Sequence, residues 1–207
     1  MSPRLTDWSI ALATGIAFLT GIISLVSGHP QEWLVFVLHA IGGFWLLLLM
    51  WGKIRRVWSR FIYFHRWDRR TIFGLLALVL VMLALGSGIW WATGGDQYFV
   101  GFNLLNWHIL LGFVVTTAIV FHMVLRAKRL RTKDVIGRRR VVQFSALLIG
   151  GVALWPGEQL SEHILNLPGA KQRFTGSREV GSCAGNAFPY HVALPTWYTW
   201  VDTLKFR

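Results

Sequence analysis

The stretch from Trp33 to Trp51, WLVFVLHAIGGFWLLLLMW, decides how the rest of the sequence is interpreted. It contains one ionisable side chain, His39, and has tryptophan at both ends. A helix needs about 20 predominantly apolar residues to cross the hydrocarbon core of a bilayer, and tryptophan favours the membrane–water interface. The stretch therefore predicts a transmembrane helix that carries a histidine within the membrane.

Four further stretches have the same apolar character. They run over residues 8–26, 71–91, from 102 or 107 to 125, and 141–155. Charged residues make up only 14% of the 207 residues, whereas a soluble domain carries about 25%. We therefore expect an all-α membrane protein: a transmembrane four-helix bundle with a fifth transmembrane helix over residues 1–155, then an irregular tail over residues 156–207. No expected span contains an acidic residue, which argues against an ion pump.

The positive charge is concentrated in two of the predicted connections. Residues 53–70 hold seven Lys and Arg and residues 126–140 hold eight, so these two segments contain 15 of the 21 in the chain. The other short connections, residues 27–32 and 92–106, hold none. By the positive-inside rule the basic segments are cytoplasmic, which predicts a cytoplasmic N-terminus and an extracytoplasmic tail in the inner (plasma) membrane. A basic inner membrane surface explains the net charge of +12 without nucleic acid.

The first two predicted helices resemble the next two. The triplet Thr20–Ile22 (TGI) corresponds to Ser87–Ile89 (SGI), and His39–Gly43 corresponds to His108–Gly112 with the histidines 69 residues apart. Two helical hairpins of this kind would form a four-helix bundle in which the second and fourth helices run in the same direction. His39 and His108 would then face each other at a similar depth.

This pair is the main candidate for chemistry. A histidine inside the membrane is costly and indicates a functional site. Gly43 and Gly112 each follow their histidine by one helical turn, and their lack of a side chain leaves room for a flat porphyrin. The pattern predicts that His39 and His108 ligate the iron of a haem b. The alternative is two histidines that hydrogen-bond between helices.

A second haem is possible nearer the cytoplasmic side. His122 follows His108 by 14 residues, which is about 21 Å along a helix. The repeat places Lys53 opposite His122, and His65 is the other candidate for the second iron ligand. Lysine ligates iron only as the neutral amine, and its ordinary role at a helix end is to snorkel toward water. Arg126 could pair with a haem propionate, and without a second haem His122 would more naturally line a quinone pocket.

These features resemble those of membrane b-type cytochrome subunits. Over residues 8–140 the chain is similar to the membrane anchors of formate dehydrogenases and nickel–iron hydrogenases and to bacterial cytochrome b561. The spacing of His108 and His122 is also similar to that in the cytochrome b of quinol–cytochrome c reductases. Lys53 departs from the pattern, because a dihaem protein would have histidine there. The resemblance implies one or two haem b groups in an electron-transfer subunit of an oxidoreductase, linking membrane quinone to an extracytoplasmic redox partner.

The tail carries a second resemblance. Arg173–Glu179 (RFTGSRE) and Gly185–Pro189 (GNAFP) look like the entry to a sulfite-oxidase-type molybdopterin domain, which implies ancestry or a partner subunit of that kind. A single cysteine, Cys183, cannot build a thiolate cluster. The rival hypothesis is a haem-free structural or assembly subunit of a larger membrane redox or photosynthetic complex. Under both hypotheses the tail would contact other subunits.

Overall fold

The computed structural model describes residues 2–27, 32–63, 65, 67, 69–94, 97–126 and 128–168, and these residues are mostly helical. The helices are α1 (Pro3–Ser24), α2 (Trp33–Ile62), α3 (Arg69–Gly94), α4 (Leu104–Arg126), α5 (Thr132–Val135) and α6 (Arg138–Ile164). Within this part of the chain, five of them, all except α5, are long and apolar enough to cross a membrane. The predictions of a mostly helical chain and of five helices of spanning length are confirmed.

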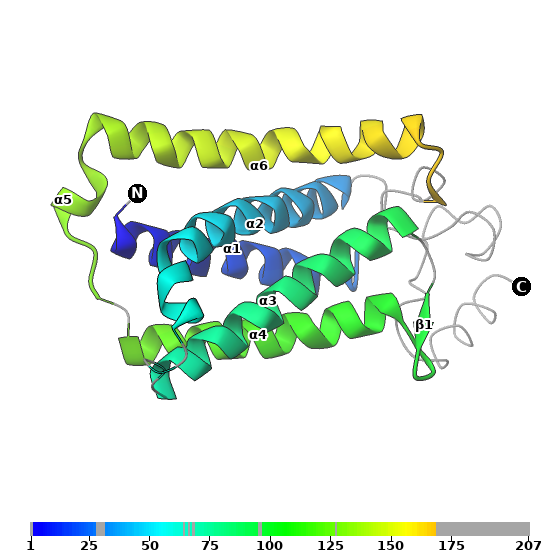
Figure 1. Ribbon diagram of the computed structural model, residues 1–207. Coiled ribbons are helices and arrows are strands. Elements are labelled where there is room, and N and C mark those ends of the chain that lie inside the picture. Colours follow the sequence, from blue (N-terminus) through cyan, green and yellow to red (C-terminus); the bar gives the residue numbers. More distant parts are fainter. Residues whose placement is uncertain are drawn as a thin grey trace, which may run out of the picture.

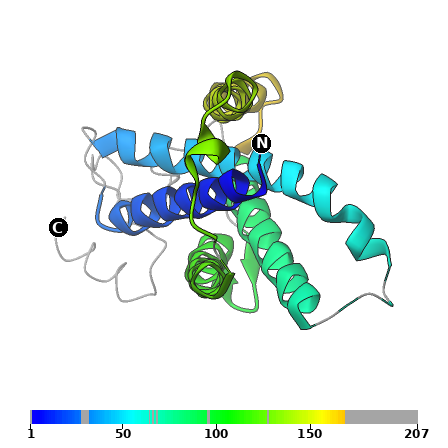
Figure 2. The same ribbon diagram turned by 90° about the vertical axis from the view of Figure 1, so that its left-hand side faces the viewer.

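The five long helices alternate in direction along one axis (Figure 1). α1 packs against α2 and α4, and α3 packs against α4. α6 packs on α2 and lies outside the other four helices, as the end view shows (Figure 2). The start of α1 and the α4–α6 connection lie at one end of the molecule (Figure 1). We call it the basic end, because the two segments rich in Lys and Arg, residues 53–70 and 126–140, connect helices there.

Apolar side chains fill the space between α1, α2, α3 and α4. The buried cluster consists of Ile10, Ala13, Trp45, Leu46, Leu49, Met50, Val81 and Val115. Many equally large apolar side chains point outward, for example Leu19 (62% exposed), Val124 (78%) and Ile149 (66%). Extended apolar faces of this kind are atypical of a soluble monomer and fit helices that contact lipid.

α1 begins five residues earlier than the apolar pattern predicts. The Ser2 side chain accepts a hydrogen bond from the backbone N–H of Leu5 at 3.2 Å, and Pro3 occupies the first turn. Serine is a favoured N-cap, and proline is preorganised for the first helical position, where its missing N–H costs nothing. The sequence therefore contains the start signal, although the apolar run itself begins only at Trp8.

The expected end of the fifth helix at Trp155 is wrong. α6 continues to Ile164 with Pro156 inside it. A proline in a helix removes one backbone hydrogen bond, but the remaining bonds of a long helix can hold the segment in register. The extension also overturns the expectation that no span holds an acidic residue, because Glu158 and Glu162 lie within α6 and Glu162 is only 3% exposed. Residues 169–207 of the tail, with Cys183 and the molybdopterin-like stretches, lie outside the described residues.

α6 contacts α2 closely because its residues are small at the crossing. A Cβ atom added at Gly151 would lie 3.0 Å from the Cβ of Trp45. The rings of Trp45 and Phe144 pack edge to face, with centroids 5.6 Å apart. Small residues that allow close backbone approach are typical of helix contacts within membranes.

A short hairpin, absent from the all-helical expectation, precedes α4. Its strands, β1 (Tyr98–Phe99) and β2 (Phe102–Asn103), pair antiparallel. The two residues between them, Val100 and Gly101, have φ angles of 51° and 78°. A type I′ turn requires positive φ at both central residues, and these two angles meet that requirement. The Asn103 side chain accepts a hydrogen bond from the backbone N–H of Asn106 at 2.9 Å and thereby caps α4. The hairpin marks the end opposite the basic end, here called the hairpin end (Figure 1).

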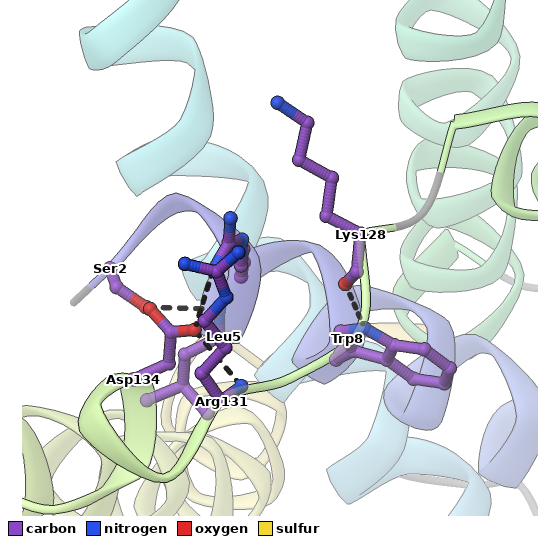
Figure 3. A network of polar contacts seen from close by, with 7 residues as sticks. Ser2, Leu5, Trp8, Lys128, Arg131 and Asp134 are labelled. Carbon is purple, nitrogen blue, oxygen red and sulfur yellow. Dashed lines mark hydrogen bonds and ion pairs between the residues drawn. The ribbon is translucent and has the colours of Figure 1, made fainter.

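The N-terminus is tied to the α4–α6 connection by a polar network (Figure 3). The Arg4 guanidinium contacts the Asp134 carboxylate at 3.3 Å, and the same oxygen accepts a hydrogen bond from the backbone N–H of Arg131 at 3.1 Å. Burial raises the pKa of Asp134, but the hydrogen bonds from Arg131, Arg4 and Ser2, together with the Arg4 charge, outweigh burial and lower it. The ionised carboxylate is therefore the form that fastens this connection.

Candidate functional site

His39 is held against α1 by hydrogen bonds at one ring nitrogen. Its Nδ1 lies 2.8 Å from the backbone oxygen of Ala17 and 3.3 Å from Oγ1 of Thr20. The ring also packs on Gly21, where an added Cβ would come within 3.1 Å of its Cε1 atom. A carbonyl oxygen can only accept, so Nδ1 carries the proton and Nε2 presents a lone pair.

His108 is held against α3 in the same way. Its Nδ1 lies 2.9 Å from the backbone oxygen of Ala84 and 3.2 Å from Oγ of Ser87. A Cβ added at Gly88 would lie 2.8 Å from the Cε1 atom of the ring. Each of these three partners follows its α1 counterpart by 67 residues, from 17 to 84, 20 to 87 and 21 to 88. The repeat therefore forms the same histidine environment twice. We call each one a socket: a backbone oxygen, a hydroxyl group and a glycine of the preceding helix that contact one histidine ring.

The two rings meet between α2 and α4, as the repeat predicts. Their centroids are 5.9 Å apart and their planes cross at 85°. Neither Nε2 atom has a hydrogen-bond partner among the described residues. Metal–imidazole nitrogen bonds are about 2 Å long, so two imidazoles on opposite sides of one metal ion have centroids roughly 6 Å apart. The observed separation of 5.9 Å fits that distance, and it equally fits a direct edge-to-face contact between the two rings.

Within the described part of the chain, no other side chain crowds the two glycines that follow the histidines. A Cβ added at Gly112 would meet nothing within 4 Å, and one at Gly43 would meet only the Cδ2 atom of Leu85 at 3.9 Å. Both glycines lie one turn from their histidines on the same helix face. Two neutral imidazoles with oriented Nε2 atoms, and open helix surface beside them, form a donor set that fits the axial positions of a haem.

Sequence reasoning found the histidines but missed what orients them. The Ala17 and Ala84 carbonyls carry no sequence signal, since any residue supplies a backbone oxygen. Thr20 and Ser87 stand out in the sequence as part of the repeat. Their hydroxyl groups donate to backbone oxygens of their own helices, at 2.7 Å to Ile16 and 2.9 Å to Ala84. A small polar residue followed by glycine, repeated in both hairpins, is the signal that could have identified the sockets.

The second predicted pair, Lys53 and His122, lies toward the basic end, where both line one cavity. The amine of Lys53 contacts the carboxylate of Asp7 on α1 at 3.0 Å. This ion pair engages the amine that a second iron ligand would have to supply. Asp7 is a residue that the sequence interpretation overlooked, because the expected first span began after it.

The remaining candidates lie away from this cavity or outside the described part of the chain. His65 is exposed and its ring packs against Tyr63 with centroids 5.8 Å apart. It is not among the residues that line the cavity. Arg126 is the last residue of α4, and its side chain lies outside the description. His122 therefore has no second histidine beside it in the described lining of the cavity.

The cavity has a volume of about 480 Å³ and lies between α1, α2, α3 and α4. This volume falls within the range of small-molecule sites. Elsewhere in the described residues, no group of three or more His, Cys, Asp or Glu side chains is placed to hold a bare metal ion. The described structure thus offers two regions of chemical interest, the histidine pair and the cavity.

Comparison with protein-family models, with curated proteins and with solved structures gives no match for this chain. The functional argument therefore rests on the geometry and chemistry of its own residues.

Proposed function

We propose that the protein is a membrane electron-transfer subunit that binds one haem b between His39 and His108. The observation that supports this proposal best is the matched pair of sockets, in which each Nδ1 is bonded to a backbone oxygen and each Nε2 has no partner among the described residues. The Nδ1 bonds already link α2 to α1 and α4 to α3, as the alternative of interhelical hydrogen bonding also requires. The Nε2 atoms are what the two histidines have left for a ligand.

In this proposal the chain's residues fix the cofactor and keep it in one coordination state. The Ala17 and Ala84 carbonyls hold each imidazole in the tautomer that can ligate, which also raises the basicity of the ligating nitrogen. His39 and His108 would hold the haem between them, and the group would supply one-electron transfer with no position left for oxygen. Both histidines are half-buried between the helices.

The redox partners in the proposal are a membrane quinone and an extracytoplasmic protein. The five helices of spanning length support a membrane location, and the two basic segments support a cytoplasmic basic end. The histidine pair would then lie toward the extracytoplasmic side, because the hairpin end precedes His108 by only a few residues. A haem at this level would lie close to the hairpin end, where an extracytoplasmic partner would dock.

This orientation can be tested with an impermeant thiol reagent in intact cells. Cys183 is first replaced by serine, and single cysteines are then introduced at Val100, which is 88% exposed at the hairpin tip, and at Arg129, which is exposed at the basic end. Labelling of Val100→Cys but not of Arg129→Cys is the expected result. The reverse labelling pattern would place the basic end outside and contradict the proposed orientation.

A reduced-minus-oxidised absorption spectrum of the purified protein tests the function itself. The expected result is a b-type α-band, with a haem content of about one per chain. A preparation that is folded by circular dichroism but lacks this band would reject the haem and favour the rival hypothesis of a structural or assembly subunit. The test needs no knowledge of the partner protein.

A further inference from the structure

The cavity at the basic end contains more positive than negative charge. Four cationic side chains line it, those of Arg4, Lys53, Arg56 and Lys128, and one acidic side chain, Asp7, does so as well. Arg4 is paired with an acidic residue of α5, and Lys53 is paired with Asp7. Arg56 and Lys128 form no ion pair within the described residues, so the cavity has two uncompensated cations.

The backbone that carries one of these cations is tied to α1. The Trp8 indole N–H donates a hydrogen bond of 3.1 Å to the backbone oxygen of Lys128. Figure 3 shows the Lys128 side chain extended away from the Ser2–Asp134 network rather than folded onto it. Arg56 reaches the same cavity from α2 and is exposed. Two cations, one on α2 and one on the connection between α4 and α5, therefore line the cavity near the basic end.

The deeper walls of the cavity are apolar. They include Ile10 from α1, Met50 from α2, Val81 from α3 and Ile119 from α4. Gly74 forms part of the α3 wall, and a Cβ added there would meet nothing within 4 Å. The lining thus changes from cationic to hydrocarbon along the cavity, which complements an anionic headgroup joined to an acyl chain.

We propose that this cavity binds an anionic phospholipid, with the phosphate between Arg56 and Lys128 and an acyl chain along the apolar walls. Basic pockets between membrane helices on the cytoplasmic side are suited to such headgroups. A neutral quinone would leave both cations without a counter-charge. A second haem would need another axial ligand beside His122, but the Lys53 amine is engaged by Asp7 at 3.0 Å. The lipid site is independent of the proposed haem at the histidine pair.

The test measures lipid binding to the full chain after purification and delipidation in detergent. Phosphatidylglycerol and phosphatidylcholine of the same acyl length are titrated separately and followed by native mass spectrometry. We expect phosphatidylglycerol to bind at least tenfold more tightly. The double variant Arg56→Gln/Lys128→Gln should lose roughly 30-fold in affinity, because each basic residue near an anionic lipid contributes about a factor of five. The matched control Arg138→Gln/Arg139→Gln removes two exposed charges of the basic end that do not line the cavity.

A second variant probes the apolar wall and does not depend on charge. Gly74→Leu should fill the cavity and abolish phosphatidylglycerol binding, whereas Gly15→Leu, at another open glycine away from the cavity, should not. Equal binding of the two lipids would overturn the proposal. So would binding of ubiquinone, if Gly74→Leu blocks it and the double glutamine variant leaves it unchanged. A haem that is lost on His122→Ala would overturn it as well. Retention of the b-type spectrum in all lipid-site variants is expected, since the histidine pair lies outside the cavity.

Discussion

The same internal repeat produces two different results at the two ends of the bundle. Near the hairpin end it places His39 opposite His108, and the preceding helices supply backbone oxygens that orient both rings. Toward the basic end, the same 69-residue offset relates Lys53 to His122, and α1 supplies a carboxylate that pairs with the lysine. The comparison shows that duplicated helices can keep their register while the corresponding positions form different contacts, a histidine bonded to a carbonyl at one level and a lysine paired with a carboxylate at the other.

The largest expected effect is the loss of haem from variants of the histidine pair. His39→Ala or His108→Ala removes one of two iron ligands, so haem retention should fall by roughly a hundredfold or more, beyond the loss typical of outer-shell changes. The measurement is haem content per chain from the reduced-minus-oxidised spectrum. His163→Ala, an exposed histidine in the last turn of α6, is the matched control and should keep the full signal. Full haem content in both site variants would refute the assignment.

A graded effect should follow from adding one methyl group beside each ring. At Gly88 a new Cβ would lie 2.8 Å from the ring of His108, and at Gly21 it would lie 3.1 Å from the ring of His39. Gly88→Ala must therefore move its ring further than Gly21→Ala does. We expect about a tenfold loss of haem affinity for Gly88→Ala, the scale of an outer-shell change, and a smaller loss for Gly21→Ala.

Haem affinity can be measured by competitive transfer to an apo-haem-binding protein. Gly15→Ala is the control, since nothing lies within 4 Å of its added Cβ. The opposite order of the two glycine variants would show that the socket geometry is not what limits binding.

The sequence was sufficient for the features that follow from periodicity and repetition. Span-length helices, the basic end and the facing pair of His39 and His108 all depend on residue type and spacing alone. The sequence could not predict which residues of neighbouring helices come into contact. The carbonyls of Ala17 and Ala84 have no distinctive residue type, and the contact of Asp7 with Lys53 requires knowing how far α1 extends and how it packs on α2.

Local signals also misled the interpretation of the fifth helix. Pro156 and Gly157 are helix breakers in water, where a freed carbonyl can bond to solvent and an unwound segment costs little. α6 continues through both residues for two further turns. Proline removes only one backbone hydrogen bond, and the remaining bonds on either side of Pro156 keep the helix continuous.

A third prediction concerns the basic end, where we expect variants to leave haem content unchanged. Lys53→Met and His122→Ala should each retain one haem per chain, because neither residue contacts the histidine pair. Lys53→Met should lower the melting temperature only slightly, since a partly exposed ion pair contributes about 0–1 kcal/mol. Pyridine haemochrome analysis of haem per chain is the measurement. Two haems in the unaltered chain, falling to one in His122→Ala, would instead show that the repeat is functional at both levels.

The smallest expected effect concerns the attachment of the N-terminus to the connection before α6. Because hydrogen bonds and the Arg4 charge lower the pKa of Asp134, its ionised form stabilises the folded state at pH values above about 4, the ordinary value for aspartate. This contribution is lost as the pH falls through the lower pKa of the folded protein. Asp134→Asn should therefore lower the melting temperature by a few degrees at most at pH 7 and make no difference in strong acid. Thermal unfolding of both proteins across this pH range is the measurement, with Lys53→Met as a control for charge loss at the same end. A difference that persisted unchanged into strong acid would mean that packing of the side chain, rather than its charge, fastens α1 to the connection.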